Sequence, residues 1–274
     1  MSQVEVNGVE LFYEVGGDGD PLVLVHGSWG DHDNWAPVLH ALALRHRVLV
    51  YDRRGHSRSG RPPGPGSRFE DEEDLAALME TLGFAPAYVA GNSFGASTAL
   101  GLAARRPGLF RALIAHEPPL MGIVADDAEQ RPLLAAAAEG IESVLGRLRA
   151  GETVAGARQF VDEVALGPGS WEQLPDRVRE TFVANAPTFA DEQADPGWAD
   201  LDLDRLSGYT GPALLTGGSD SPPWFAAITA RLARALPRAQ THTYAGAGHI
   251  PHVTHPDAYA NLLTAFTDSL RRPS

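Results

Sequence analysis

The chain has 274 residues, a mass of 29.2 kDa and 43% hydrophobic side chains, enough for one large α/β domain or a core domain with an insertion. Its formal net charge of −13 disfavours non-specific binding to nucleic acid or anionic membranes, so we expect a small-molecule substrate. Cysteine and lysine are both absent, which excludes disulfides, thiolate metal ligands, cysteine nucleophiles, Schiff bases and the P-loop lysine.

The N-terminal sequence "MSQVEVNGVELFYEV" has no basic segment followed by an apolar one, as a secretory signal would. No apolar stretch in the chain approaches the roughly 18 to 20 residues of a membrane span. We therefore expect a soluble, cytoplasmic protein that does not enter membranes. The sequence leaves its oligomeric state open.

Predicted strands alternate with predicted helices through residues 4–117. Two short strands flank the Asn7-Gly8 turn, and further strands are predicted at 21–25, 47–51, 87–91 and 111–117. Helices are predicted at 35–44, at 70–83, where acidic residues form the first turn, and from 96 onward. The Pro/Gly-rich segment 60–67 must be a loop. This alternation indicates βαβ units and a mostly parallel central sheet flanked by helices.

The pattern changes between residues 118 and 211, where the signals are helical and no convincing strand occurs. Strands return at 211–218 and 239–246, and a helix at 256–270 ends the chain. We therefore predict a core domain made of 1–117 and 212–274, with 118–211 inserted as a helical cap over the ligand-binding edge of the sheet. As a set, five aromatic residues of this cap suggest an apolar or aromatic substrate, although for each one alone packing between the cap helices is the favoured interpretation: Phe160, Trp171, Phe182, Phe189 and Trp198.

Ser93 lies in "GNSFG", between a predicted strand and a predicted helix, and this matches the G-x-S-x-G nucleophile elbow. Gly91 and Gly95 would allow strand and helix to cross closely while the serine backbone is held in a strained conformation. The alternative is a helix-capping serine in a Gly-rich turn. A serine hydroxyl needs a base and an oriented acid to act as a nucleophile.

His249 is the predicted base, because it follows small residues on the loop after the last strand. His252 is its nearest rival and is otherwise expected at the substrate pocket. Asp220, in "LLTGGSDSPP", is the predicted acid, and the order Ser, Asp, His is the one expected for this topology. Glu117, at the end of the strand that follows the serine's helix, is the competing acid; otherwise it would be a pocket or cap-hinge residue.

The segment "VLVHGSWG" follows an early strand, and there the backbone N–H of Ser28 is expected to point toward Ser93. Together with the N–H of Phe94 it would form an oxyanion hole. Trp29 and Asn92, which neighbour these positions, are expected to line the substrate pocket; the alternative for Trp29 is a place in the core.

The chain resembles the α/β-hydrolase superfamily over nearly its whole length. The motifs "HGSW", "YDRRGHSRSG", "GNSFG", "GGSD" and "GAGHIPH" occur in the expected order. Ser57 stands where glycine is common in such families, a departure expected to affect only that turn. The resemblance implies that Arg53, Arg54 and His56 belong to a structural turn and are not catalytic.

Within this superfamily a serine at the elbow suits acyl transfer, whereas epoxide hydrolases and haloalkane dehalogenases need an aspartate. The leading hypothesis is therefore a hydrolase of a small apolar or aromatic ester or lactone that needs no metal and no organic cofactor. A C–C bond hydrolase, another serine-based acyl chemistry such as a cofactor-free perhydrolase, and a receptor-like ligand-binding protein with little turnover are the alternatives.

Overall fold

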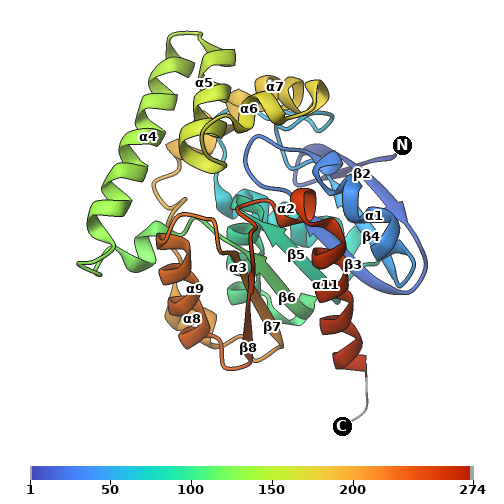
Figure 1. The fold of residues 1–274 in the computed structure, drawn as a ribbon. Coiled ribbons are helices and arrows are strands. Elements are labelled where there is room, and N and C mark those ends of the chain that lie inside the picture. Colours follow the sequence, from blue (N-terminus) through green and yellow to red (C-terminus); the bar gives the residue numbers. More distant parts are fainter. Residues whose placement is uncertain (1, 272–274) are drawn as a thin grey trace.

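The computed structural model describes residues 2–271, and its centre is a single sheet of eight strands (Figure 1). The strands are β1 (Ser2–Val6), β2 (Val9–Gly16), β3 (Asp20–Val25), β4 (His46–Tyr51), β5 (Ala87–Asn92), β6 (Phe110–His116), β7 (Ala213–Gly218) and β8 (Ala239–Tyr244). Their order across the sheet is β1-β2-β4-β3-β5-β6-β7-β8. The predicted fold class, a mostly parallel sheet flanked by helices, is confirmed.

Strand direction determines where a site can form in this sheet. β1 and β2 form an antiparallel hairpin around the Asn7-Gly8 turn, and β2 pairs antiparallel with β4. All other neighbouring strands pair in parallel, so their carboxyl ends meet at one edge. In β5 all six residues are buried, as expected for a central parallel strand covered on both faces.

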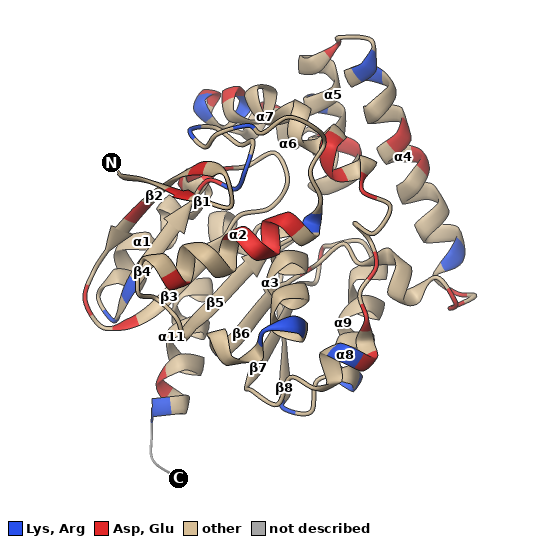
Figure 2. Ribbon diagram, turned by 180° about the vertical axis from the view of Figure 1, so that it is seen from behind, with Lys and Arg blue, Asp and Glu red and all other residues tan. Residues whose placement is uncertain are grey.

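Helices cover both faces of the sheet and bury a hydrophobic core on each side. One face carries α2 (Arg68–Thr81), α3 (Phe94–Arg105) and α9 (Trp224–Ala235), as seen from behind in Figure 2. The other face carries α1 (Ala36–Ala43) and α11 (Pro256–Arg271), which pack against each other. The Pro/Gly-rich segment 60–67 is a loop without helix or strand, as predicted.

Residues 118–211 are helical, as predicted, and hold no strand. The segment contains α4 (Arg131–Arg149), α5 (Thr153–Gln159), a π-helical turn (Phe160–Ala165), α6 (Ser170–Gln173), α7 (Asp176–Ala194) and α8 (Leu203–Ser207). α4 to α7 lie together beyond the sheet, and we call them the helical layer (Figure 1). α8 instead packs against α3 and α9 on the core.

The helical layer has a hydrophobic core of its own, built on one residue of the sheet domain. Trp29, in the loop after β3, is fully buried among Phe160, Phe182 and Phe189 of the layer. Its ring centroid lies 5.0, 6.1 and 4.9 Å from theirs, respectively. Within residues 2–271, no helix combines the length and apolarity needed to span a bilayer.

Candidate active site

Ser93 lies at the sharp turn between β5 and α3, with the strained backbone angles φ 55° and ψ −125°. Glycines make this turn possible. A Cβ atom at Gly91 would lie 2.4 Å from the carbonyl oxygen of Gly95, and one at Gly95 would lie 2.3 Å from that of Val25. Real Cβ contacts are never that short, so only glycine allows strand, turn and helix to approach this closely. The turn has the geometry predicted from the motif.

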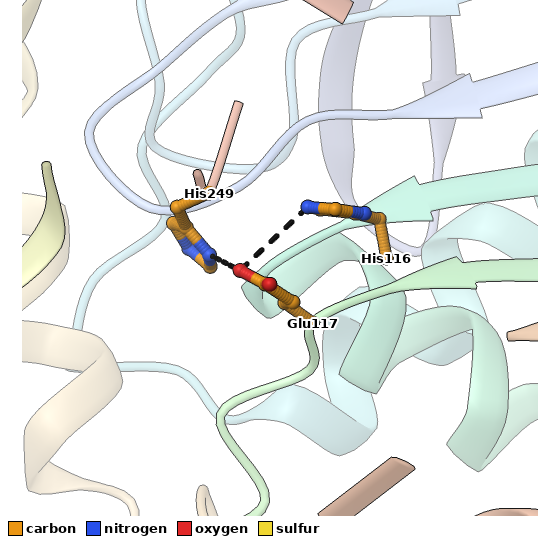
Figure 3. A group of neighbouring side chains, drawn as sticks. All are labelled: His116, Glu117 and His249. Atoms are coloured by element: carbon orange, nitrogen blue, oxygen red, sulfur yellow. Dashed lines mark hydrogen bonds and ion pairs between the residues drawn. The ribbon is translucent and has the colours of Figure 1, made fainter. Parts of the chain in front are cut away.

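His249, on the loop after β8, is hydrogen-bonded to Glu117, which directly follows β6 (Figure 3). The His249 Nδ1 and the Glu117 Oε2 are 2.7 Å apart. The Ser221 hydroxyl donates to the same oxygen at 2.9 Å, and the Gly218 N–H donates to the other carboxylate oxygen at 2.7 Å. Burial raises the pKa of Glu117, but the hydrogen bond and charge of His249 outweigh it and hold this pKa at about 2.

Asp220 lies elsewhere, and the structure corrects its predicted pairing with His249. Its side chain is exposed and accepts a hydrogen bond from the Ser219 hydroxyl at 2.8 Å. The backbone explains the difference. The Asp220 N–H donates to the carbonyl of Ala247, which fixes the turn after β7, whereas Glu117 has a φ of 44° that turns its side chain under His249.

Ser93 and His249 both line a cavity of about 330 Å³ between the carboxyl edge of the sheet and the helical layer. Both also line a smaller cavity of about 50 Å³ on the side of α4 and α9. Ser28, Phe160 and Ala165 are likewise shared by the two cavities. The two side chains therefore lie at the junction of two mostly apolar chambers.

The cap aromatics predicted near the substrate divide between these cavities and the interior of the layer. Phe160 lines both cavities, Phe182 lines the larger one, and Phe189 and Trp198 line the smaller one. Trp171 borders neither of these two cavities and is buried in the core of the helical layer.

The residues predicted for the oxyanion hole flank Ser93 from two directions. Phe94 is the first residue of α3, where a backbone N–H has no partner within the helix. Ser28 follows β3 and lines both cavities. A Cβ at Gly27 would lie 2.9 Å from the Ser93 Cβ, so this loop passes directly beside the serine.

The predicted pocket residues have different positions. Asn92 lines the larger cavity, and its side-chain nitrogen donates to the carbonyl of His249 at 2.9 Å. Trp29 does not line either cavity, because its indole is occupied by the aromatic rings of the helical layer. Glu117 is also absent from both walls and lies beneath His249. The structure thus corrects the pocket assignments of Trp29 and Glu117.

His252 is buried against Trp35, with ring centroids 4.4 Å apart, and it lines neither cavity. Burial, with a contribution from the charges of His116 and His249, lowers the pKa of His252 to about 3. It is therefore a neutral core side chain, and its predicted place at the pocket is corrected.

We expect His252→Phe to make the stability of the folded protein less dependent on pH. The unfolded chain binds a proton at this histidine below about pH 6.5, whereas the folded chain does not until about pH 3, so acid favours unfolding. Removing the group should reduce the slope of unfolding free energy between pH 6 and 4 by ~1.4 kcal/mol per pH unit. Urea unfolding at several pH values measures this slope; an unchanged slope would contradict the assignment.

Among residues 2–271, two clusters of side chains have the composition of a metal site: His116, Glu117 and His249, and Asp31, His32 and Asp52. In each cluster one pair is hydrogen-bonded: His249 Nδ1 to Glu117 at 2.7 Å, and His32 Nδ1 to Asp52 at 2.6 Å.

A sheet of this order, with a strained serine after β5 and a histidine after β8, defines the class of the protein as an α/β hydrolase. The family model described as "alpha/beta hydrolase fold" matches residues 20–256, and the chain belongs to this family.

Among its relatives is the uncharacterized hydrolase YraK of Bacillus subtilis, with 40% identity over 123 residues. That match covers 44% of this chain and 45% of the relative, so the matched part spans less than half of that protein. An α/β hydrolase structure from Sphaerobacter thermophilus has 28% identity and a TM-score of 0.78, covering 97% of this chain and 100% of that one. The enol-lactonase from Burkholderia xenovorans LB400 has 25% identity and a TM-score of 0.72, with the same coverage.

Proposed function

We propose that this α/β hydrolase is a serine hydrolase that cleaves a carboxylic ester or lactone of a small apolar or aromatic molecule through an acyl-enzyme intermediate. One observation carries the proposal: His249 is oriented by the buried Glu117 carboxylate and shares two cavities with the strained Ser93. This is the arrangement of nucleophile, base and acid that acyl transfer needs.

In the proposed mechanism the Glu117 carboxylate accepts a hydrogen bond from the protonated Nδ1 of His249, which leaves the lone pair of Nε2 free to face the cavity. Nε2 takes the hydroxyl proton as Ser93 Oγ attacks the substrate carbonyl carbon. The N–H groups of Ser28 and Phe94 stabilise the oxyanion of the tetrahedral intermediate. Collapse of the intermediate breaks the bond to the leaving group, which receives the proton from His249.

Deacylation repeats these steps with water as the nucleophile. His249 takes a proton from water as the water oxygen attacks the acyl carbon. Collapse of the second tetrahedral intermediate then breaks the bond to Ser93 Oγ, which receives that proton from His249, and the carboxylic acid is released. Throughout, Glu117 holds the imidazole in one tautomer and stabilises the imidazolium without taking its proton.

The walls of the two cavities support the proposed substrate class. Apolar side chains dominate both: Phe160, Leu166, Leu174, Val178 and Ile250 line the larger cavity, and Met121, Ile141, Trp224 and Phe225 line the smaller one. The likeness to an enol-lactonase supports lactones as well as open esters.

Turnover of p-nitrophenyl acetate and butyrate, together with labelling by a fluorophosphonate probe, tests the proposal. We expect both short esters to be hydrolysed and the probe to attach covalently at Ser93, as peptide mass spectrometry can establish. The absence of both turnover and labelling would overturn the enzyme assignment in favour of a receptor-like ligand-binding role.

We propose further that the helical layer, as the predicted cap, selects the substrate. Phe182→Ala, which enlarges the larger cavity, is expected to change kcat/KM for aromatic against acetyl esters by roughly 10-fold, the effect of an altered hydrophobic pocket. The fluorophosphonate labelling rate should stay close to wild type. Leu133→Ala, an exposed position on α4, is the matched control. Unchanged selectivity of the Phe182 variant would contradict the role of this layer.

A further inference from the structure

Arg53, in the loop after β4, is a fully buried cation that reaches three parts of the protein. Its side chain is 1% exposed. Nη1 donates to the Asp71 carboxylate of α2 at 2.7 Å, and Nη2 forms an ion pair with Glu192 of α7. Nη2 also donates to the carbonyl oxygen of Gly27 at 3.3 Å. These contacts bring a full positive charge next to the loop that precedes Ser28.

His26 donates to the same carbonyl, and its neighbours determine its tautomer. The Arg53 backbone N–H donates to His26 Nε2 at 3.0 Å, so the ring proton must lie on Nδ1. Nδ1 is 2.8 Å from the Gly27 oxygen and therefore donates to it. Burial, together with the charge of Arg53, lowers the pKa of His26 to about 3, which keeps the ring neutral and this arrangement intact.

The Gly27 carbonyl and the Ser28 N–H belong to one peptide unit. In a trans peptide they point in opposite directions, so holding the oxygen toward Arg53 and His26 directs the N–H away from them. Hydrogen bonds to the oxygen also polarise the peptide and make its N–H a stronger donor. The Arg53 guanidinium carbon lies 4.8 Å from the ring centroid of Phe94, whose own N–H is the other proposed oxyanion donor.

We propose that Arg53 is a positioning residue for the reaction: with His26 it orients and polarises the Gly27–Ser28 peptide so that the Ser28 N–H stabilises the oxyanion. The proposal rests on the serine-hydrolase function proposed above. A purely structural ion pair between α2 and α7 would be complete with Asp71 and Glu192 and would not need the contact to Gly27.

The test is Arg53→Lys, compared with Arg54→Lys. A lysine keeps the charge but cannot bind two carboxylates and the Gly27 carbonyl at once, because it lacks the planar fork of donors. Arg54, the next residue in the same loop, is a matched control, since it also pairs with two carboxylates, Glu70 and Asp74 of α2. Loss of a whole oxyanion donor costs about 10²–10³ in kcat, so weakening one should lower kcat for p-nitrophenyl butyrate by about 10-fold with little change in KM.

A second readout separates positioning from general loss of structure. The sulfur of a thionoester accepts hydrogen bonds weakly, so the rate ratio of an ester to its thionoester depends on the oxyanion donors. We expect this ratio to fall in Arg53→Lys and to stay at the wild-type value in Arg54→Lys. A folded Arg53→Lys variant with unchanged kcat and unchanged ratio would overturn the proposal.

If Arg53→Lys does not fold, as judged by circular dichroism, His26→Phe replaces it, because this change removes the other donor to the Gly27 carbonyl and keeps the ring volume. The same fall in kcat and in the ester-to-thionoester ratio is expected, and wild-type values would overturn the proposal. A wild-type protein that neither hydrolyses esters nor reacts with the fluorophosphonate would instead contradict the proposed function itself, which keeps the two failures distinct.

Discussion

Ser93→Ala is expected to abolish ester hydrolysis while the protein remains folded. The change removes only a hydroxyl on a half-buried turn, so the melting temperature should stay near that of the wild type. The expected loss in kcat is on the order of 10⁶-fold, because the nucleophile and its base act together and removing either one removes the effect of both. Steady-state kinetics and thermal unfolding of the purified variant measure the two effects.

Ser97→Ala is the matched control for this experiment. Ser97 lies one turn further along α3, is fully buried, and its hydroxyl has no hydrogen-bond partner among the described residues. Its removal should leave both activity and folding unchanged. Retention of more than about a tenth of wild-type activity in Ser93→Ala would show that Ser93 is not the nucleophile, since a unit of this kind loses several orders of magnitude.

Glu117→Gln is expected to lower kcat by about 10⁴, whereas Asp220→Asn should leave it close to wild type. The amide presents either a donor or a weaker acceptor to His249 Nδ1, so the imidazole loses its orientation and its charge compensation. Asp220 is exposed and its carboxylate accepts a hydrogen bond from the Ser219 hydroxyl of the same turn, which makes it the matched carboxylate control. Measuring kcat for both variants at the pH optimum decides between the two acids, and a larger loss in Asp220→Asn would return the role to that residue.

The same carboxylate affects stability. Because the pKa of Glu117 is lowered from 4.5 to about 2 in the folded protein, its ionised form stabilises the fold above about pH 4.5. This stabilisation is lost as the pH falls toward 2, when the folded carboxylate also becomes protonated. Glu117→Gln should therefore be less stable than wild type at neutral pH, and the difference should shrink with acid.

Much of the fold was predictable because local patterns agree with the topology. The alternation of apolar strands with amphipathic helices gave the parallel sheet, and the glycines around Ser93 predicted the turn that the backbone adopts. The helical character of 118–211 was also predictable. The sequence did not separate α8 from the helical layer, because packing against α3 depends on tertiary contacts.

The acid could not be assigned from sequence, since Glu117 and Asp220 both follow strands that end at the same edge of the sheet. The distinction depends on one backbone angle at residue 117 and on the hydrogen bond from the Asp220 N–H to the Ala247 carbonyl, which fixes the turn after β7. Neither leaves a signal in residue type. In the same way, Trp29 and His252 lie next to residues of the site in sequence, but their side chains point into cores.

The position of Trp29 restricts how the helical layer of this protein could be replaced by the corresponding helices of a related protein. Trp29 lies in the loop after β3, about 100 residues before α4, the first helix of the layer whose hydrophobic core contains its indole ring. A chimera that received the helices of another protein without the contacting aromatic residues would leave this large ring without its partners Phe160, Phe182 and Phe189. Replacing the helical layer therefore requires that residue 29 be changed together with the helices, because the loop after β3 and the layer share one hydrophobic core.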